Sequence, residues 1–435
     1  MRGRRSERAA EQIRAELAEL VENEVADPRV GSVVVTGVRL SADGKQAEVL
    51  VSRPDRGEGE RECLRGLESA RGFLRHELAT RLQLRHTPEL RFTIDHGPEH
   101  ARRVEVLLER IKKRAPLLVL LLAATSPGAE MLRYEASAPA MGSVYTVAAY
   151  HPDRANVSAA VEAAFREARR IDELLSNYRP DSELSEVNRR AAERPVKVSP
   201  ELFDLLERCQ QYSRLSEGAF DWTVGSLMRV WGFYKGSGRL PQRAAVEQAL
   251  GSAGYQRLEL DGERRTVRFQ VAGMELDPGG IGKGYAVDRM LDVLREAGIE
   301  VALISASGSS IYALGSPPGE KGWHVRVRDP KSESLTVAEL YLKDQSFSTS
   351  GAYEKFFEAE GKTYSHIMDP RTGYPARGMA SVSVLAPRTL DSEAWTKPLF
   401  VNGGQWARRR LPSGMRALLC EENKPCYWLP AEAGE

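Results

Sequence analysis

A glycine-rich stretch in the second half of the chain, LDPGGIGKGYAVDRML at residues 276–291, contains the residue types that hold a phosphate group. Strand-like residues precede the turn and a helix is predicted to begin near Tyr285, so the first helical N–H groups would point toward whatever the turn holds. Lys283 adds a positive charge, and Asp277 offers an acceptor for a sugar or a base. The glycines that allow a close backbone approach are Gly279, Gly280, Gly282 and Gly284.

The spacing of these glycines fits neither the P-loop pattern nor the dinucleotide-binding fingerprint. The residues alone therefore leave two interpretations of the stretch open. In one it binds a nucleotide pyrophosphate, and in the other it is a structural turn between a strand and a helix.

A second candidate for chemistry lies in YSHIMDPRTGYPA, residues 364–376. A single histidine is more often a structural residue than a catalyst. Here His366 is followed by the carboxylate of Asp369, the guanidinium of Arg371 and a turn at Gly373. These neighbours favour a general base that takes a proton from a hydroxyl group.

The elements that must position these residues alternate between strand and helix. AMGSVYTVAAY, residues 140–150, alternates in the manner of a strand, and SAAVEAAFREARRIDELLS, residues 158–176, has apolar positions at helical spacing. This alternation predicts an α/β or α+β domain over residues 130–435.

Together with SNYRPDSELSEVN, GAFDWTVGSLMRVWGF and DSEAWTKPLFVNG, these segments resemble the FAD:protein FMN transferase, or ApbE, family from about Met141 to Gly404. The resemblance implies a bilobal α+β enzyme of the T-fold-like type. It further implies that the enzyme binds FAD and holds Mg²⁺. FMN would be transferred through a phosphoester bond to a Thr or Ser hydroxyl of an acceptor flavoprotein, with release of AMP.

The resemblance also assigns roles to single residues. The residues expected to contact FAD are Met141, Tyr178, Ala219, Phe220, Asp221, Asp277, Lys283 and Ile367. His366 would be the catalytic base. The metal would be held by the Gly280 carbonyl, Glu393 and Thr396.

Two positions depart from the family pattern. The usual Asp-Ala-Leu-Ala-Thr segment at the metal reads EAWTK at residues 393–397, and the ammonium of Lys397 donates hydrogen bonds but cannot ligate a metal. Either the metal site is rearranged, with Asp391 as a further ligand, or Lys397 supplies part of the positive charge itself. The second departure is Ser307, which takes the first place of a common Gly-Gly pair.

Residues 1–114 have an α-β-β-α-β pattern. Apolar residues at helical spacing end at Asp27-Pro28, and two strands follow in VGSVVVTGVRLS and KQAEVLVS. A helix from about Glu60 to Leu82 then leads to a strand in LRFTID. The segments ADPRVGSVVVTGVRLSADGKQAEVLVS and LQLRHTPELRFTID resemble the ribosome-binding factor A family, which implies a KH-like α+β domain.

The same resemblance implies binding to the immature small ribosomal subunit at its rRNA. Residues 1–114 contain 23 Lys and Arg against 20 Asp and Glu, which is a small positive excess. Most such charges lie on a solvated surface, and charge alone does not establish RNA binding. The candidates for phosphate contact are Arg29, Lys45, Arg81 and Arg85.

Residues 112–129, KKRAPLLVLLLAATSPGA, have the layout of a secretory signal peptide, although they lie inside the chain. The apolar run is shorter than the roughly 20 residues that span a bilayer, so no stable membrane span is expected. We predict a ribosome-binding factor A-like domain at 1–114, a signal-like linker at 115–129 and a flavin transferase domain at 130–435. An intact fusion would be cytoplasmic. Residues 130–435 would be exported if the signal-like segment is used, as expected if two neighbouring genes are read as one frame.

The overall composition, 42% hydrophobic and 28% charged with a net charge of +1, is that of an ordinary soluble globular protein. The cysteines form neither a disulfide framework nor a zinc spacing. Cys420 and Cys426 would pair in an exported chain, but two thiols are the preferred interpretation.

The predicted function is flavin transfer fused to ribosome maturation. The alternative is an RNA-binding assembly factor with an FAD-binding domain that lacks transferase activity.

Overall fold

The chain divides into two compact units, residues 1–125 and residues 126–435. The computed structural model describes residues 13–14, 16–18, 20–21, 27, 30, 33–41, 46–52, 58–82, 87–94, 131–235 and 238–430. The signal-like segment 112–129 lies outside the described residues, as do Arg29, Lys45 and Arg85.

The first unit is built on a three-stranded sheet. Its elements are β1 (Val34–Leu40), β2 (Gln46–Ser52), α2 (Glu58–Leu82) and β3 (Glu89–Ile94). β1 and β2 are antiparallel, whereas β2 and β3 are parallel, and α2 supplies the crossover that parallel neighbours need. The buried Leu67, Leu74 and Leu78 lie on one side of α2 and join the sheet residue Val49 in one core. The unit therefore has the predicted α+β class.

An antiparallel sheet of eight strands forms the centre of the second unit, in the order β20-β19-β18-β13-β10-β9-β5-β4. Its strands are β4 (Leu132–Ala140), β5 (Ser143–His151), β9 (Val301–Ala306), β10 (Ser310–Leu314), β13 (Gln345–Gly351), β18 (Met379–Ala386), β19 (Arg416–Glu421) and β20 (Tyr427–Leu429). Successive side chains point to opposite faces. On β5, Tyr145 and Val147 join the core beneath the helices, and Ala148 joins the core of the other face.

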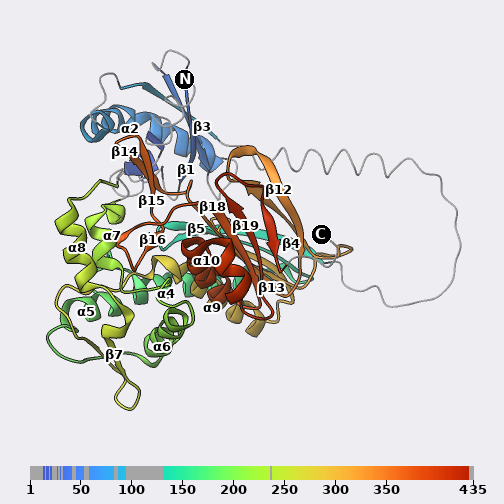
Figure 1. Cartoon of the computed structure of the whole chain (residues 1–435). Coiled ribbons are helices and arrows are strands. Elements are labelled where there is room, and N and C mark those ends of the chain that lie inside the picture. Colours follow the sequence, from blue (N-terminus) through green and yellow to red (C-terminus); the bar gives the residue numbers. More distant parts are fainter. Residues whose placement is uncertain are drawn as a thin grey trace, which may run out of the picture. The chain divides into compact units, whose positions relative to one another are not determined.

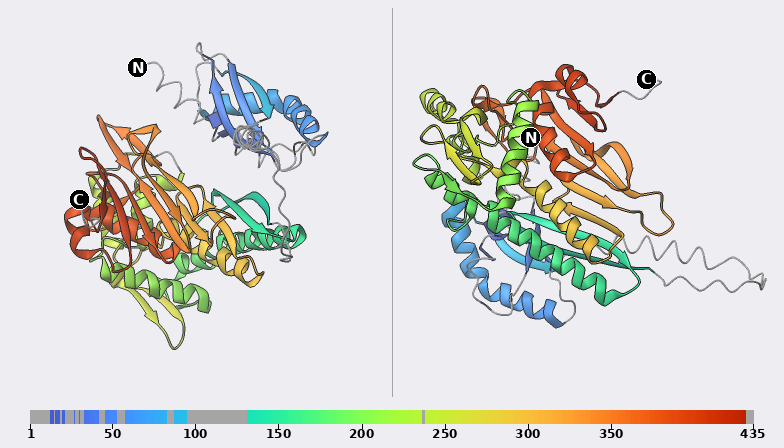
Figure 2. Two further views of the ribbon diagram at one scale, coloured as in Figure 1. Left: turned by 90° about the vertical axis from the view of Figure 1, so that its right-hand side faces the viewer. Right: turned by 90° about the horizontal axis from the view of Figure 1, so that it is seen from below.

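Three helices pack on one face of this sheet: α4 (Arg154–Leu175), α9 (Gly282–Glu296) and α10 (Thr389–Arg410). α9 contacts both of the others, and Figure 2 shows α4 and α9 side by side. The opposite face packs against the hairpin of β11 (Trp323–Asp329) and β12 (Ser332–Leu342). Among the described residues, no helix combines the length and the apolar character that a membrane crossing requires.

A second lobe of this unit lies at the helices α5 to α8 (Figure 1). Its elements are α5 (Glu183–Arg190), β6 (Val196–Lys197), α6 (Pro200–Leu215), α7 (Gly225–Val230), η1 (Phe233–Lys235), α8 (Arg243–Ser252), η2 (Tyr255–Arg257), β7 (Leu258–Asp261), β8 (Thr266–Phe269) and η3 (Pro278–Gly280). The small pairs β14 (Phe356–Ala359) with β15 (Lys362–Ser365) and β16 (Met368–Asp369) with β17 (Tyr374–Pro375) complete the unit. Trp231 and Val246 of this lobe share a core with Tyr364 and Met368, which flank His366.

The N-terminus of α10 is capped from α9. The buried carboxylate of Asp288 accepts hydrogen bonds from the N–H groups of Thr389 at 2.7 Å and Leu390 at 3.0 Å. The first N–H groups of a helix have no partner within the helix, so Asp288→Ala is expected to lower the free energy of unfolding by about 2 kcal/mol. Urea unfolding of the full chain measures this, with Asp292→Ala on the same helix as the control. An unchanged midpoint would contradict the capping role.

Cys420 on β19 and Cys426, just before β20, form a disulfide. The prediction of two thiols is therefore wrong for this pair. The antiparallel pairing of β19 with β20 brings the two cysteines together, and their spacing in the sequence does not reveal that pairing. Cys63 and Cys209 are buried and are not disulfide-bonded.

Candidate functional site

The glycine-rich stretch folds as the 3₁₀ turn η3, which leads directly into α9. Asp277 caps this turn, because its Oδ1 accepts a hydrogen bond from the Gly279 N–H at 2.9 Å. The Asp277 N–H donates to the Trp222 carbonyl at 2.8 Å. Burial raises the pKa of Asp277 to about 6, although the hydrogen bond from Gly279 opposes this. These hydrogen bonds fix the backbone of the turn in one conformation, and a fixed backbone can bind a ligand.

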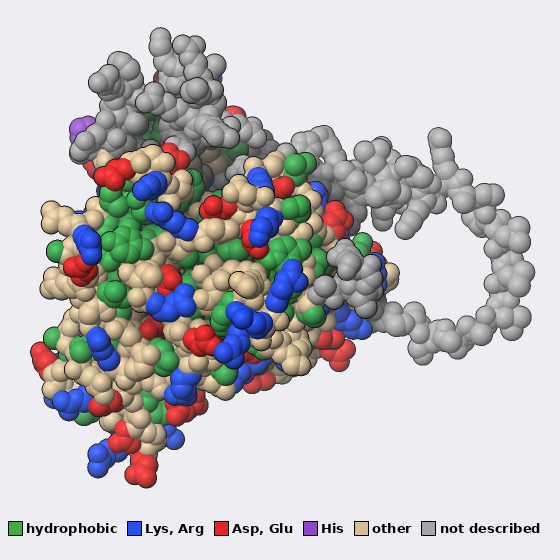
Figure 3. Space-filling view, in the orientation of Figure 1, with side chains coloured by type: hydrophobic (Ala, Val, Ile, Leu, Met, Phe, Trp, Pro, Cys, Tyr) green, Lys and Arg blue, Asp and Glu red, His purple; other side chains and the backbone are tan. Residues whose placement is uncertain are grey.

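Three lysines from different elements act electrostatically on His366, and we call them the lysine cradle: Lys283, Lys355 and Lys397. Lys283 lies in the first turn of α9, where its Nζ contacts Ser309 Oγ. Lys355 precedes β14, and Lys397 lies on α10. On the face shown in Figure 3, by contrast, charges of both signs are interspersed. Like charges gathered around one point favour an anionic ligand such as a pyrophosphate.

His366 is held in one tautomer by Lys355. Its Nδ1 lies 3.1 Å from the Lys355 carbonyl oxygen, which also accepts the His366 backbone N–H at 2.9 Å. A carbonyl oxygen only accepts, so Nδ1 carries the proton and Nε2 keeps a lone pair. The pKa of His366 is lowered to about 4, mainly by burial and in addition by the charges of the lysine cradle. His366 is therefore neutral at pH 7, with Nε2 able to accept a proton.

The titration of His366 is a direct test of this environment. In the free protein we expect an NMR titration midpoint of about 4 instead of the ordinary 6.5. Because the folded-state pKa is the lower one, the unfolded chain binds the proton more tightly, and His366 reduces stability as the pH falls from 6.5 toward 4. ADP should raise the midpoint, since its phosphates offset the lysine charges. A midpoint near 6.5 without ligand would contradict the proposed burial and charge effects.

Two apolar side chains lie against the glycine-rich turn. A Cβ built on Gly280 would lie 3.6 Å from Phe220 Cε2, and one built on Gly282 would lie 2.9 Å from Met141 Cε. Met141 adopts a positive φ of 53°. The structure thus brings the predicted residues Met141 and Phe220 together with the turn, where a side chain in place of Gly282 would collide.

Tyr178 is placed at the open side of this region. Its side chain is 73% exposed, and its hydroxyl donates to the Tyr234 carbonyl at 3.0 Å. The two tyrosine rings meet edge to face with centroids 5.9 Å apart. Burial raises the pKa of Tyr178, and the charge of Asp277 adds to this effect, which places Tyr178 within electrostatic range of the turn. An exposed aromatic ring beside the turn is suited to stacking on a flavin or an adenine.

Three of the residues predicted to contact FAD have buried side chains. Asp221 is buried, and its carboxylate accepts hydrogen bonds from the Thr223 N–H and hydroxyl and from the Tyr255 N–H. Ala219 is 1% exposed and Ile367 is 5% exposed. These side chains fix the loops that carry Phe220 and His366.

The predicted metal ligands already have partners in the protein. Glu393 Oε2 accepts a hydrogen bond from the Gly284 N–H. The Thr396 hydroxyl donates to the Glu393 carbonyl at 2.6 Å and lies 2.7 Å from Ser350 Oγ. Among the described residues, no group of three His, Cys, Asp or Glu side chains could hold a metal ion. Because both side-chain ligands are engaged by protein groups and the Lys397 ammonium lies beside Glu393, the residues present do not fit the Mg²⁺ that the family resemblance implies.

Lys397 lies beside two of the residues expected to hold the metal, Glu393 and Gly280. Its Nζ donates to the Glu393 carbonyl at 3.1 Å and lies 4.0 Å from Glu393 Oε1, while its Cε would be 3.6 Å from a Cβ on Gly280. Burial lowers the pKa of Lys397 to about 8, and Glu393 opposes the lowering. Asp391 does not replace the missing ligand, because its carboxylate accepts from Arg208 at 3.1 Å and from the Tyr212 hydroxyl.

Lys355 and Ser309 belong to the site but could not be predicted from the sequence, and the structure accounts for Ser307. Lys355 stands in the segment AYEKFF, where nothing in the local pattern distinguishes it from a surface lysine. Ser309, the partner of Lys283, is similarly inconspicuous. Ser307 has a positive φ of 50°, which accounts for a glycine being common at this place, and its hydroxyl accepts from the Val144 N–H at 3.1 Å.

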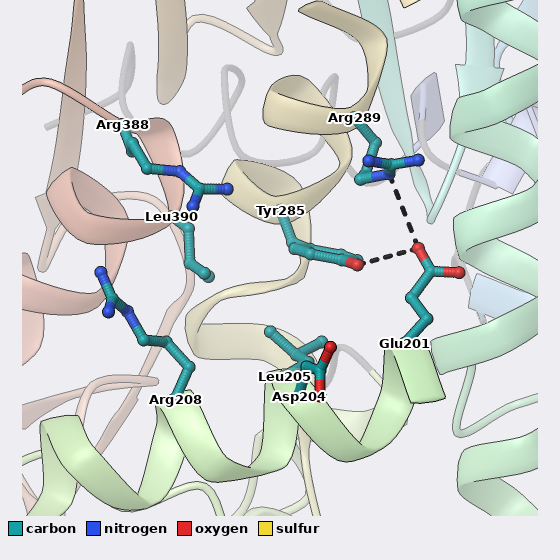
Figure 4. Close-up of a pocket in the computed structure, with 8 residues that line it drawn as sticks. All are labelled: Glu201, Asp204, Leu205, Arg208, Tyr285, Arg289, Arg388 and Leu390. Carbon is teal, nitrogen blue, oxygen red and sulfur yellow. Dashed lines mark hydrogen bonds and ion pairs between the residues drawn. The ribbon is translucent and has the colours of Figure 1, made fainter. Parts of the chain in front are cut away.

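A pocket of about 520 Å³ lies on another side of α9 (Figure 4). Its lining residues are Glu201, Asp204, Leu205, Arg208, Tyr285, Arg289, Arg388 and Leu390. None of the predicted site residues is among them. Its arginines are paired with carboxylates, for example Arg289 with Asp292 at 2.9 Å and Arg388 with Asp288 at 3.5 Å. The pocket is therefore distinct from the lysine cradle.

Comparison with known sequences gives two matches along the chain. Residues 141–419 match the ApbE family, and residues 5–108 match ribosome-binding factor A. The FAD:protein FMN transferase of Klebsiella pneumoniae (strain 342) is 35% identical over 271 residues, which are 61% of this chain and 82% of the relative. The FAD:protein FMN transferase of Treponema pallidum (strain Nichols) is 35% identical over 264 residues, 57% of this chain and 73% of the relative.

Solved structures share the fold of the second unit. The ApbE crystal structure from Thermotoga maritima has a TM-score of 0.63 at 30% identity, covering 68% of this chain and 96% of that chain. The flavin transferase ApbE from Vibrio cholerae has a TM-score of 0.62 at 25% identity, covering 70% and 98%. Fold, motifs and relatives define the second unit as a flavin transferase that uses FAD. The chain belongs to the ApbE family, with a ribosome-binding factor A region at residues 5–108.

Proposed function

We propose that residues 126–435 transfer FMN from FAD to the hydroxyl of a Thr or Ser in an acceptor flavoprotein and release AMP. The observation that carries this proposal is the contact of His366 Nδ1 with the Lys355 carbonyl, which leaves Nε2 to accept a proton within electrostatic range of the lysine cradle. A hydroxyl nucleophile needs a base, and a pyrophosphate needs fixed positive charge. Both requirements meet at this point.

The reaction follows from these two features. His366 Nε2 accepts the proton of the acceptor hydroxyl, whose oxygen bonds to the flavin-side phosphorus of FAD. The bond from that phosphorus to the bridging oxygen breaks, and this oxygen leaves with AMP. The lysine cradle stabilises the negative charge that develops on the departing phosphate, which then takes the proton from Nε2. FAD itself offsets the lysine charges and so raises the pKa of His366 when the site is loaded.

Mg²⁺ dependence, which the family resemblance predicts, is not part of this proposal. The metal ligands expected from the sequence, Glu393 and Thr396, make hydrogen bonds with other protein groups, and Lys397 lies beside Glu393 and Gly280. No step is assigned to a metal ion.

To test the proposal, the full chain is incubated with FAD and a candidate acceptor protein. Mass spectrometry of the acceptor should show covalent FMN on a Thr or Ser, and chromatography should show an equal amount of AMP. Bound FAD without modified acceptor and without AMP would support the alternative, an FAD-binding domain without transferase activity.

For the first unit we propose binding to the small ribosomal subunit, supported by the match of residues 5–108 to ribosome-binding factor A. Arg81, one of the predicted phosphate contacts, has a guanidinium that pairs with Glu16 at 3.0 Å and Glu77 at 3.6 Å. Cosedimentation of the full chain with immature small subunits at several salt concentrations tests binding. Arg91→Glu, at an exposed position on β3, should weaken it.

The location of the protein is a further proposal. An intact chain would remain in the cytoplasm, and a product containing residues 130–435 would be exported if residues 112–129 act as a signal. The Cys420–Cys426 disulfide supports the exported product, since such bonds persist mainly in oxidising compartments. N-terminal sequencing of the protein from separated cell fractions tests this, and a single full-length cytoplasmic chain would argue against export.

A further inference from the structure

Lys397 stands where the family has a threonine, and it gives the site a positive charge before any substrate binds. Lys397 is on α10, and its ammonium lies 3.1 Å from the Glu393 carbonyl and 4.0 Å from Glu393 Oε1. Its Cε would lie 3.6 Å from a Cβ built on Gly280. The ammonium therefore lies beside Glu393, and its stem lies close to Gly280, two of the residues that the resemblance assigns to a metal ion.

The other two groups assigned to the metal also contact protein groups. Glu393 Oε2 accepts from the first turn of α9, through the Gly284 N–H. The Thr396 hydroxyl is turned toward the Glu393 carbonyl and Ser350, inside a layer that joins α10 to β13. Mg²⁺ requires nearly octahedral oxygen ligands at short distance, and an ammonium in their midst repels it.

We propose that the Lys397 ammonium is a built-in cation that takes the place of Mg²⁺, so that this enzyme transfers FMN without a divalent metal. The inference rests on the proposed function. Lys397 and Lys283 would contact the pyrophosphate of FAD from α10 and from the first turn of α9, respectively. Lysine is a compact point charge that binds phosphate without a fixed geometry, which suits this role. Lys397 is thereby a catalytic residue that contacts the substrate.

Three variants of the full chain test the inference in FMN transfer assays with EDTA or with added Mg²⁺. The wild-type rate should be the same in EDTA and in Mg²⁺. Lys397→Thr, which restores an oxygen ligand, should be at least tenfold slower in EDTA and should recover with Mg²⁺. Lys397→Met should be slow in both, because it supplies neither charge nor oxygen. Lys343→Met, at an exposed lysine, is the control and should behave like the wild type.

A second measurement does not depend on turnover. Mn²⁺ added with FAD should give the electron paramagnetic resonance signal of free Mn²⁺ for the wild type and a bound-Mn²⁺ signal for Lys397→Thr. Loss of wild-type transfer in EDTA with recovery in Mg²⁺, or Mn²⁺ bound by the wild type, would overturn the inference and leave the proposed function intact. Absence of transfer under both conditions would instead overturn the proposed function, and the Mn²⁺ signals would still decide the inference.

Discussion

Replacing His366 with alanine is expected to lower the rate of FMN transfer by about 10²–10⁴-fold, the usual contribution of a positioned general base. The reason is that Nδ1 is fixed by the Lys355 carbonyl, which leaves Nε2 as the proton acceptor. FAD binding should persist, because Tyr178, Asp277 and Lys283 come from other elements. Single-turnover transfer and quenching of flavin fluorescence measure the two effects separately.

The matched control for this variant is His324→Ala. His324 lies on β11, where its Nε2 is 3.0 Å from Glu339 Oε2, and it has no part in the proposed reaction. Its replacement should leave the transfer rate unchanged. A His366→Ala variant with the wild-type rate would remove His366 from the mechanism.

The second large effect is expected from Gly284→Val, which separates the two helices that form the site. A Cβ on Gly284 would lie 2.5 Å from the Thr389 carbonyl oxygen, and a backbone atom cannot yield as a flexible side chain can. We expect the free energy of unfolding to fall by about 3 kcal/mol through overpacking. We also expect transfer to fall by about 10²-fold, because Lys283 and Lys397 move apart. Denaturant unfolding and the transfer assay measure these changes.

Gly251→Ala is the control for this substitution. Gly251 lies in α8, and a Cβ at this position would have no atom within 4 Å. Alanine there should raise the free energy of unfolding by about 0.5–1 kcal/mol, because it restricts the unfolded chain. If Gly284→Val were as stable and active as this control, the close packing of α9 on α10 would not matter for the site.

Local features of the site could be predicted from the sequence. Four glycines around one lysine are visible as a motif, and the turn η3 with α9 after it follows the expected arrangement. The α+β class is confirmed for both units, since alternation and helical spacing are local properties. His366 also remains the candidate base, and the structure adds the reason for its tautomer.

Features that depend on contacts between distant segments could not be predicted. Lys397 meets Gly280 only because α10 packs against α9, more than a hundred residues away in the sequence. The ion pair of Arg81 with Glu16 could not be predicted either, because the two residues are 65 positions apart in the sequence. The same holds for Asp391, whose carboxylate is taken by Arg208 of α6.

The disulfide between Cys420 and Cys426 closes a loop with a sequence separation of only 6. A bridge acts mainly by reducing the chain entropy of the unfolded ensemble, and for so short a loop the gain is about 2 kcal/mol. Folded domains have a total stability of roughly 5–15 kcal/mol, so most of it comes from the sheet and its helices. The second unit can therefore complete its fold with both thiols reduced and gain the bond afterwards. Oxidation would then cross-link β19 to the chain just before β20 at one edge of the sheet. Flavin transfer would not require this bond.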